Sequence, residues 1–188
     1  SCRRPGAGDR GQAPRGIRCG STRERHTGYR RAVRFLVTGA TGFLGLNLVE
    51  QLSERGWVVH AYHRPTSDTK RLRTFPVRLA EGDIADFDAV AAAMPQGADA
   101  VFHLAAVVSG AAEADFDLGM RVNLKGMELL LAQMRKCSRP PRLVYTSSVA
   151  AFGGDLPAVL DDSTIANPQT SYGAQKVIGE YLVTDYSR

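Results

Sequence analysis

The sequence predicts an α/β fold in which helices cover both faces of a doubly wound parallel sheet. From residue 34 onward, short apolar segments alternate with amphipathic segments of helical period. A glycine-rich turn also joins the first of these apolar segments to the first helical one. Strands and helices that alternate along a chain form right-handed crossovers, which produce a parallel sheet between two helical layers.

Each predicted element follows from its local pattern. The first strand (RFLVT) precedes the glycine-rich turn, and the helix after that turn ends before Gly56. The helix that begins at Phe116 is expected to end before Pro140, because proline cannot continue a helix. The predicted strands are Arg34–Thr38, Trp57–Tyr62, Val77–Glu81, Ala100–Leu104 and Arg142–Ser147. The predicted helices are Phe43–Arg55, Asp86–Met94, Phe116–Lys136 and Ser171–Tyr186.

The formal net charge of +5 is unevenly distributed. Residues 1–32 contain nine arginines and two acidic residues, so they carry +7 and residues 33–188 carry −2. The predicted domain therefore lacks the basic surface of a nucleic-acid-binding protein. Residues 1–32 are also rich in glycine and have no hydrophobic period, so we expect a disordered tail before one domain over residues 33–188. Such a tail is typical of a basic arm or of an upstream extension.

Several classes of protein are excluded by the rest of the composition. No apolar run approaches the roughly 20 residues that span a bilayer, so no membrane partner is expected. The chain has three cysteines, Cys2, Cys19 and Cys137, too few and too scattered for a disulfide framework. Its four histidines have no metal-ligand spacing, so no metal site is expected. These features favour a cytoplasmic protein.

The turn after the first strand, TGATGFLG (Thr38–Gly45), has the spacing of a dinucleotide-binding turn. The first glycine allows a sharp turn, the second allows a diphosphate to approach the backbone, and the third allows close packing of helix on sheet. The free N–H groups at the helix N-terminus favour phosphate. The residues expected to hold the dinucleotide here are Gly39, Thr41, Gly42, Phe43, Leu44 and Gly45.

The end of the second strand distinguishes NAD from NADP. NAD sites usually carry an acidic residue there, which accepts hydrogen bonds from the ribose hydroxyls. This sequence has His63 in that place and Arg64 after it. Because a guanidinium suits a 2′-phosphate better than a bare ribose, NADP is the expected cofactor and NAD the alternative. Arg64 as an ordinary solvent-exposed cation is the other interpretation.

Asp83 and Ile84 follow the third strand, on the ligand side of the predicted sheet. The Asp83 carboxylate is placed to accept a hydrogen bond from the adenine amino group. An N-cap or turn-forming role for Asp83 agrees equally well with the local sequence.

Tyr172 and Lys176 lie one helical turn apart in SYGAQK, so they share one face of the last helix. The ammonium favours the phenolate and lowers the pKa of Tyr172 from about 10 toward neutrality. A tyrosine tuned in this way exchanges protons with a substrate oxygen. Ser148 closes the fifth strand and is expected to hydrogen-bond the same oxygen.

Six motifs in this order make residues 34–188 resemble the extended short-chain dehydrogenase/reductase family, which includes NAD(P)-dependent epimerases and dehydratases. The motifs are TGATGFLG, GDI (Gly82–Ile84), HLAA (His103–Ala106), Asn123 in RVNLKG, YTSSVAAFGG (Tyr145–Gly154) and SYGAQK. The resemblance implies an NAD(P)-binding Rossmann fold and a catalytic triad of Ser148, Tyr172 and Lys176, supported by Asn123. It also implies that Tyr172 and Lys176 contact the nicotinamide ribose and that Leu104, Ala105 and Ala106 line the cofactor.

Different parts of the sequence resemble two subgroups of that family. Residues 34–102 resemble dihydroflavonol-reductase-type members, which favour NADP. Residues 103–188 resemble the D-erythronate dehydrogenase group, which oxidises a four-carbon sugar acid with NAD. By this resemblance Val107, Ser109, Ser148 and Phe152 are the expected substrate contacts. Since the family continues beyond the position of Arg188, the Rossmann domain is expected to be truncated at its C-terminus.

The expected function is an oxidoreductase that transfers a hydride between a nicotinamide and a secondary alcohol or ketone, with a small sugar acid as the candidate substrate. Two alternatives remain: a nucleotide-sugar epimerase or dehydratase, and a non-catalytic dinucleotide-binding fragment. The resemblance also implies a homodimer through helices Phe116–Lys136 and Ser171–Tyr186. No nucleic-acid partner is expected.

Overall fold

The computed structural model describes residues 32–188 of the chain. Apart from Ala32, the tail predicted over residues 1–32 lies outside the described residues. Within them, five strands pair in parallel to form one sheet in the order β3-β2-β1-β4-β5. The strands are β1 (Arg34–Thr38), β2 (Val58–His63), β3 (Arg78–Glu81), β4 (Ala100–His103) and β5 (Arg142–Tyr145). The chain reverses its direction of winding between β1 and β4, so the predicted doubly wound parallel α/β fold is confirmed.

The helical segments alternate with the strands along the chain. The α-helices are α1 (Phe43–Glu54), α2 (Phe87–Ala93), α3 (Ser109–Ala114), α4 (Phe116–Gly119), α5 (Gly126–Lys136) and α6 (Ser171–Tyr186). Short 3-10 turns form η1 (Leu72–Thr74) and η3 (Val149–Ala151), and η2 (Met120–Lys125) is a π-helix.

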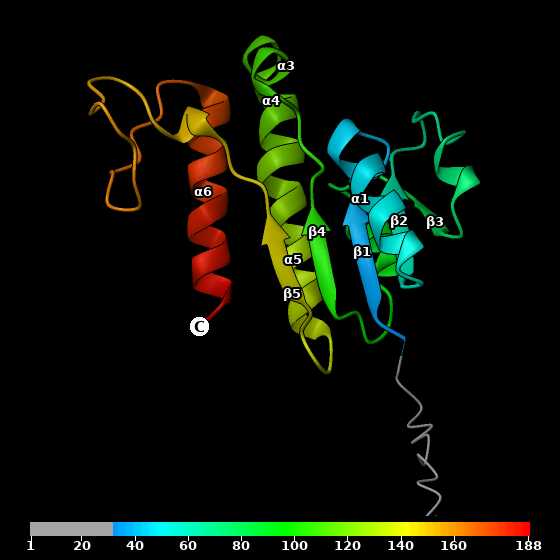
Figure 1. Cartoon of the computed structure of the whole chain (residues 1–188). Coiled ribbons are helices and arrows are strands. Elements are labelled where there is room, and N and C mark those ends of the chain that lie inside the picture. Colours follow the sequence, from blue (N-terminus) through cyan, green and yellow to red (C-terminus); the bar gives the residue numbers. More distant parts are fainter. Residues whose placement is uncertain (1–31) are drawn as a thin grey trace, which may run out of the picture. The chain divides into compact units, whose positions relative to one another are not determined.

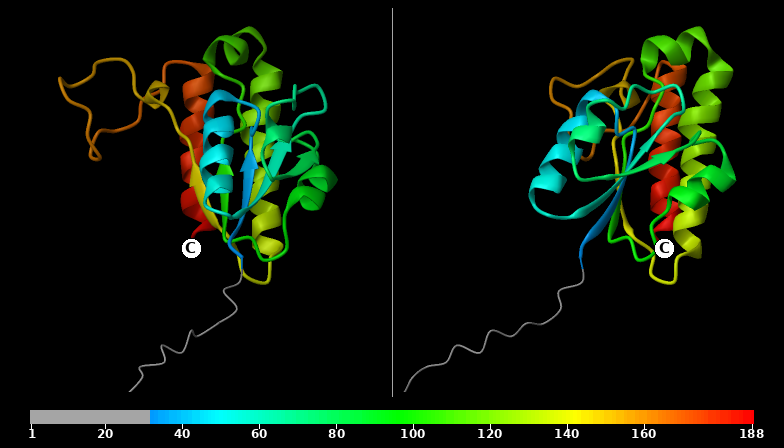
Figure 2. Two further views of the ribbon diagram at one scale, coloured as in Figure 1. Left: turned by 45° about the vertical axis from the view of Figure 1, so that its right-hand side comes forward. Right: turned by 90° about the vertical axis from the view of Figure 1, so that its right-hand side faces the viewer.

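Helices cover both faces of the sheet, as Figures 1 and 2 show: α1 lies on one face, and α2, α5 and α6 lie on the other. Because side chains alternate along a strand, β1 supplies both layers. Val37 packs with Val49 of α1, whereas Leu36 packs with Val90 of α2 and Leu130 of α5. These two apolar layers fix the sheet between the helices and hold the carboxyl ends of the strands at one edge.

One predicted helix differs in the structure. The helix expected over Phe116–Lys136 is formed by α4, η2 and α5 in succession, so its middle six residues are π-helical. A π-helical turn contains an extra residue, which turns a side chain out of the α-helical register. Asn123 lies in this turn and is buried. The fifth strand also ends at Tyr145 rather than at Ser147, as the chain leaves the sheet there.

A long connection without helix or strand joins η3 to α6. In Figures 1 and 2 the orange part of this connection, within residues 152–170, projects away from the sheet. Across the described residues, no helix is both long and apolar enough to cross a membrane.

Candidate active site

The turn between β1 and α1 lies against the backbone that follows β4. Gly39 has φ +67, and a Cβ at this position would lie 2.8 Å from the Ala105 backbone nitrogen. Glycine is required here by both the left-handed backbone and the close approach. Gly42 is the N-cap of α1 and provides no side-chain acceptor, and the first turn of α1 contains no acidic residue. The N–H groups at the start of α1 are therefore suited to an anionic ligand.

Not every predicted residue of the turn points toward a ligand. The side chains of Phe43 and Leu44 are 83% and 60% exposed. Neither residue lines the pocket that opens next to this turn. Gly45 packs against the turn itself, since a Cβ there would lie 2.2 Å from the Gly39 carbonyl oxygen.

A pocket opens at the carboxyl ends of four strands, next to this turn. Eleven of the predicted cofactor or substrate residues line it: Gly39, Thr41, Gly42, His63, Arg64, Asp83, Ile84, Leu104, Ala105, Ala106 and Val107. The other lining residues are Tyr62, Ser67, Gly82, Leu118, Arg121 and Val122. Ser67 follows Arg64 in a segment already expected to suit a 2′-phosphate, and Gly82 belongs to the GDI motif. Leu118, Arg121 and Val122 belong to α4 and η2, and no local sequence signal places them beside the glycine-rich turn.

The end of β2 presents a buried imidazole, His63, and an exposed guanidinium, Arg64. His63 is buried, and its Nδ1 lies 3.0 Å from the Arg64 carbonyl oxygen. Arg64 is exposed at the pocket, and Ser67 lines the same pocket. The positive charge of Arg64 also contributes to the low pKa of Asp83 across the pocket. This end of the pocket therefore combines a guanidinium with a hydroxyl.

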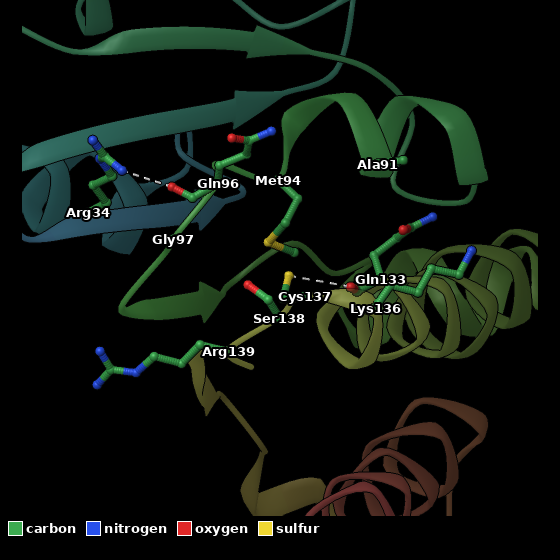
Figure 3. A pocket seen from close by; sticks show the side chains of 10 residues that line it. All are labelled: Arg34, Ala91, Met94, Gln96, Gly97, Gln133, Lys136, Cys137, Ser138 and Arg139. Atoms are coloured by element: carbon green, nitrogen blue, oxygen red, sulfur yellow. Dashed lines mark hydrogen bonds between the residues drawn. The ribbon is translucent and has the colours of Figure 1, made fainter.

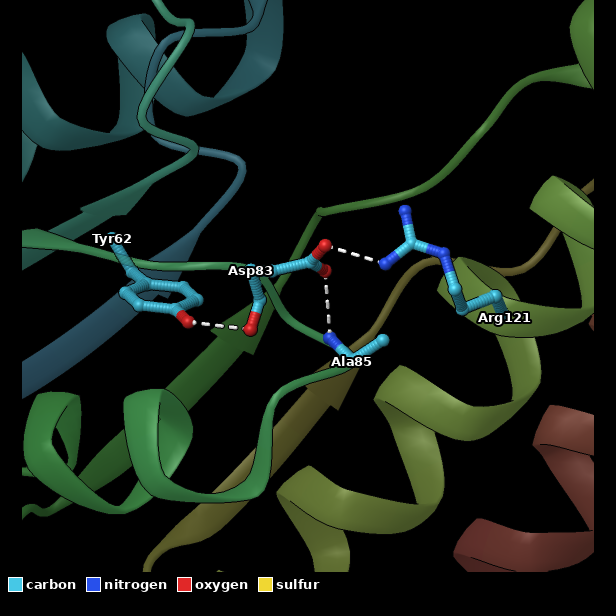
Figure 4. Close-up of polar contacts among 4 residues, drawn as sticks. All are labelled: Tyr62, Asp83, Ala85 and Arg121. Carbon is cyan, nitrogen blue, oxygen red and sulfur yellow. Dashed lines mark hydrogen bonds and ion pairs between the residues drawn. The ribbon is translucent and has the colours of Figure 1, made fainter.

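Asp83 forms a small polar network at the pocket (Figure 4). Its carboxylate accepts hydrogen bonds from the Arg121 guanidinium and from the Ala85 N–H, while its carbonyl oxygen accepts one from the Tyr62 hydroxyl. Partial burial favours the protonated carboxyl, but these two donors outweigh it and hold the pKa of Asp83 below its usual value. The N-cap of α2 is Asp86, so Asp83 forms a turn and does not cap that helix.

Lys176 and Tyr172 of α6 meet at the end of β5. Lys176 is 3% exposed, and its Nζ donates a hydrogen bond of 2.9 Å to the Thr146 carbonyl oxygen. Nζ also lies 4.9 Å from the centre of the Tyr145 ring and 5.7 Å from that of Tyr172. Burial lowers the pKa of Lys176 from its usual value. A buried amine is thus held beside the half-buried ring of Tyr172.

The N-terminal end of α6 packs closely on η3, which follows Ser148. A Cβ at Gly173 would lie 2.1 Å from the Ala150 carbonyl oxygen, so only glycine permits this approach. The Ser148 hydroxyl caps η3 by accepting from the Ala150 N–H at 3.2 Å. Phe152 follows η3, and Ser109 begins α3, which also packs against α6. Ser109, Ser148 and Phe152 therefore belong to segments around the start of α6, outside the lining of the pocket beside the glycine-rich turn.

The backbone that follows β4 is held by two buried polar groups. Thr38 Oγ1 accepts from the Ala105 N–H and lies 2.8 Å from His103 Nδ1. Burial, assisted by the nearby Lys176 charge, lowers the pKa of His103 to about 3. Asn123 pairs with Val107 in both directions: Nδ2 donates to the Val107 carbonyl and Oδ1 accepts from its N–H.

Two further polar residues near Tyr172 and Asn123 were missed by the sequence analysis. Glu113 of α3 accepts a hydrogen bond of 2.9 Å from the Tyr172 N–H, and Gln175 Oε1 accepts one of 2.7 Å from Asn123 Nδ2. Both partners are more than 50 positions away in the sequence, so no local pattern indicates either contact.

A larger pocket lies at the opposite edge of the sheet (Figure 3). It is lined by Arg34 at the start of β1, by Lys136 at the end of α5, and by Cys137 and Arg139 after that helix. Burial raises the pKa of the Cys137 thiol, which donates to the Gln133 carbonyl, so this thiol is unsuited to nucleophilic chemistry. In residues 32–188 no cluster of metal-ligating side chains is present. We therefore place the candidate site at the carboxyl edge, where the glycine-rich turn, Tyr172 and Lys176 lie.

Comparison with known proteins agrees with this choice. Residues 35–188 match the model of the NAD dependent epimerase/dehydratase family. The chain belongs to this family. The resemblance expected from the six motifs is thereby confirmed, since the match covers all of them.

Members of the epimerase/dehydratase family with assigned names extend the comparison. A D-erythronate dehydrogenase from Cupriavidus necator is 48% identical over 81% of this chain and 50% of its own length. A putative dihydroflavonol 4-reductase from Synechocystis is 37% identical over 81% of this chain and 42% of its own length. Both subgroups predicted from the sequence are represented. The chain spans about half the length of the curated relatives that it matches.

Solved structures of the family have the same architecture. The UDP-glucose 4-epimerase from Brucella ovis, solved in complex with NAD, is 28% identical and superimposes with a TM-score of 0.75. The superposition covers 83% of this chain and 48% of the epimerase.

Proposed function

We propose that this chain forms the dinucleotide-binding and catalytic half of an oxidoreductase that interconverts a secondary alcohol and a ketone. The observation that carries the proposal is the juxtaposition of Lys176 and Tyr172 at the carboxyl edge of the sheet, the edge that also bears the glycine-rich turn. The relatives named D-erythronate dehydrogenase support a small sugar acid as the substrate.

The residues present suit a nicotinamide dinucleotide. The diphosphate would lie on the uncapped start of α1, next to Gly39 and Gly42. The bound nicotinamide would accept or supply the hydride. Asp83, Leu104 and Ala106 line the same pocket and would contact the remainder of the molecule.

In the proposed reaction, Tyr172 exchanges a proton with the substrate oxygen. Lys176, whose Nζ lies 5.7 Å from the centre of the Tyr172 ring, would contact the nicotinamide ribose beside that phenol. Ser148 would donate a hydrogen bond to the same oxygen, and Asn123 would hold the segment at Val107 in place. Positioning of both reactants supplies much of the rate in reactions of this kind.

The proposed function is tested by titrating the chain with NADH and NADPH for binding, and by following absorbance at 340 nm when D-erythronate is added with NAD+ or NADP+. Saturable binding and release of stoichiometric reduced cofactor are expected for a dehydrogenase. The solved relatives named epimerases favour the alternative that the cofactor stays bound through the cycle, which would give no net reduced cofactor. The half-length coverage favours a second alternative, binding without turnover. A version extended at its C-terminus would then turn over while this chain would not.

We further propose that NADPH binds more tightly than NADH. The support is the Arg64 guanidinium at the pocket and the absence of an acidic residue at the end of β2. Replacing Arg64 by Asp is expected to shift the ratio of the two dissociation constants toward NADH by about 10- to 100-fold, because a charged hydrogen bond to the 2′-phosphate is lost. Arg73→Asp, outside the pocket, is the matched control. An unchanged ratio would contradict the assignment.

We also propose that two copies of the chain form a homodimer. Met120 of η2 and Ile178 of α6 are exposed and line one apolar groove, and Tyr181 is exposed nearby on α6. Pairing of two copies through these helices would cover that groove. Sedimentation of the chain at increasing concentration is expected to show a twofold rise in mass. A constant monomer mass would refute the dimer.

A further inference from the structure

Gln175 is a buried polar residue within the catalytic helix, between Tyr172 and Lys176. Its side chain is 1% exposed. Its Oε1 accepts a hydrogen bond of 2.7 Å from Asn123 Nδ2, while its Nε2 has no hydrogen-bond partner within residues 32–188. A buried N–H without a partner destabilises a folded protein, so a glutamine in this place requires a reason.

The direction of the hydrogen bonds reveals what the amide does. The Val107 N–H donates to Asn123 Oδ1 at 2.8 Å, which leaves Asn123 Nδ2 to face the Val107 carbonyl and Gln175. Only an acceptor suits the position opposite Nδ2. The Gln175 amide therefore turns its oxygen toward Asn123 and leaves its nitrogen unpaired.

The surroundings are shaped to hold this amide. A Cβ at Gly119 of α4 would lie 2.7 Å from Gln175 Nε2 and 3.0 Å from Oε1. The π-helical turn of η2 contains Asn123, and the segment with Val107 follows β4. Three elements thus meet through two side-chain amides: α6, η2 and the backbone that lines the dinucleotide pocket.

We propose that Gln175 is a positioning residue that ties the catalytic helix to the wall of the dinucleotide pocket. Through Asn123 it keeps Val107 in a fixed place relative to Tyr172 and Lys176. The phenol of Tyr172 and the segment that follows β4 then move as one unit. That this contact positions catalytic groups rests on the proposed function. The hydrogen-bonded link from Gln175 through Asn123 to Val107 does not depend on it.

The test uses hydrogen exchange of backbone amides, measured by NMR on the 188-residue chain without dinucleotide. Gln175→Met keeps the length of the side chain and removes both polar atoms. In this variant the Val107 amide is expected to exchange roughly tenfold faster, because the partner that orients Asn123 is lost, while the Val37 amide in β1 changes little. An equal acceleration at both amides would overturn the proposal, since it would report general destabilisation only.

Gln133→Met is the matched control. Gln133 is also a buried helical glutamine, but its Nε2 donates to the Phe87 carbonyl, away from Asn123. This variant is expected to leave Val107 exchange unchanged relative to Val37. A similar acceleration of Val107 in Gln133→Met would overturn the proposal.

Two further measurements keep the test decisive. Gln175→Glu retains an acceptor oxygen opposite Asn123, so it is expected to keep Val107 exchange within about threefold of the unmodified chain. Exchange as fast as in Gln175→Met would count against the tie.

If Gln175→Met does not fold, the unmodified chain still provides an answer. Both Nδ2 protons of Asn123 should exchange slowly, because one is donated to Val107 and the other to Gln175, and rapid exchange of both would overturn the proposal. If the unmodified chain did not bind NADH, the proposed function would be contradicted, but the exchange results expected for Val107 and Asn123 would be the same.

Discussion

Replacing Tyr172 by Phe is expected to lower the rate of hydride transfer by about 10²- to 10⁴-fold, the range typical of a lost general acid or base. The aromatic ring that lies 5.7 Å from Lys176 Nζ is kept, and only the hydroxyl is removed. The N–H of residue 172 would still donate to Glu113, so the start of α6 stays in place. Dissociation constants for NADH should therefore change by less than about threefold, because dinucleotide binding does not depend on proton transfer.

Tyr181→Phe provides the matched control for this experiment. Tyr181 belongs to the same helix, but its side chain is 71% exposed and lies outside the pocket. Absorbance at 340 nm gives turnover, and quenching of protein fluorescence by NADH gives affinity. If Tyr172→Phe turned over at the rate of Tyr181→Phe, the proton-transfer role of Tyr172 would be wrong.

Acid is expected to unfold the domain because of His103. This imidazole is buried, and burial disfavours its charged form, so its pKa falls from 6.5 to about 3. The unfolded chain therefore binds a proton that the folded chain does not bind between these two pH values. The free energy of unfolding should fall as the pH drops through that window, by roughly 1 kcal/mol per pH unit from this group. His60, whose pKa is also lowered by burial, adds to the loss in the same direction.

Urea unfolding at a series of pH values measures this dependence. His103→Asn retains a polar atom near Nδ1 to pair with the Thr38 hydroxyl, but it cannot titrate. This variant should be less stable at pH 7, and its stability should depend less steeply on pH between 6.5 and 4. A variant with the slope of the unmodified chain would show that His103 is not the group responsible.

The fold could be predicted from the sequence because its signals are local. Strands β1, β2, β4 and β5 are short and mostly apolar, and the glycine-rich turn lies between a strand and a helix, the context that a dinucleotide-binding turn requires. The predicted strand and helix boundaries differ from the observed ones by at most two residues where the element ends in solvent or at a turn. Two helical segments differ: Phe116–Lys136 contains a π-helical turn, and α3 (Ser109–Ala114) was not predicted. The π-helical turn holds Asn123, whose partner Val107 lies 16 residues away, so the local sequence does not indicate this contact.

The candidate site could be predicted only in part, for a related reason. Residues such as Asp83 and Lys176 have recognisable spacings from glycines or tyrosines. Their partners do not: Arg121 lies 38 residues from Asp83, and the carbonyl that accepts from Lys176 belongs to the backbone of Thr146, 30 residues away. Backbone carbonyls and distant cations leave no pattern in the local sequence, so their contribution becomes visible only when the chain is folded.

Because of the π-helical turn at Met120–Lys125, the number of residues between α4 and α5 cannot change by one without altering the pocket. Deleting one residue from this turn would remove the extra residue and restore α-helical geometry, so the side chains within the turn would change direction. Arg121 would then swing away from Asp83, and Asn123 would lose the backbone of Val107. A one-residue deletion in a helix that is distant from the glycine-rich turn in the sequence, but lines the same pocket, would thus misplace two polar side chains at once. The same deletion in the connection before α6 would leave the sheet and its carboxyl edge intact.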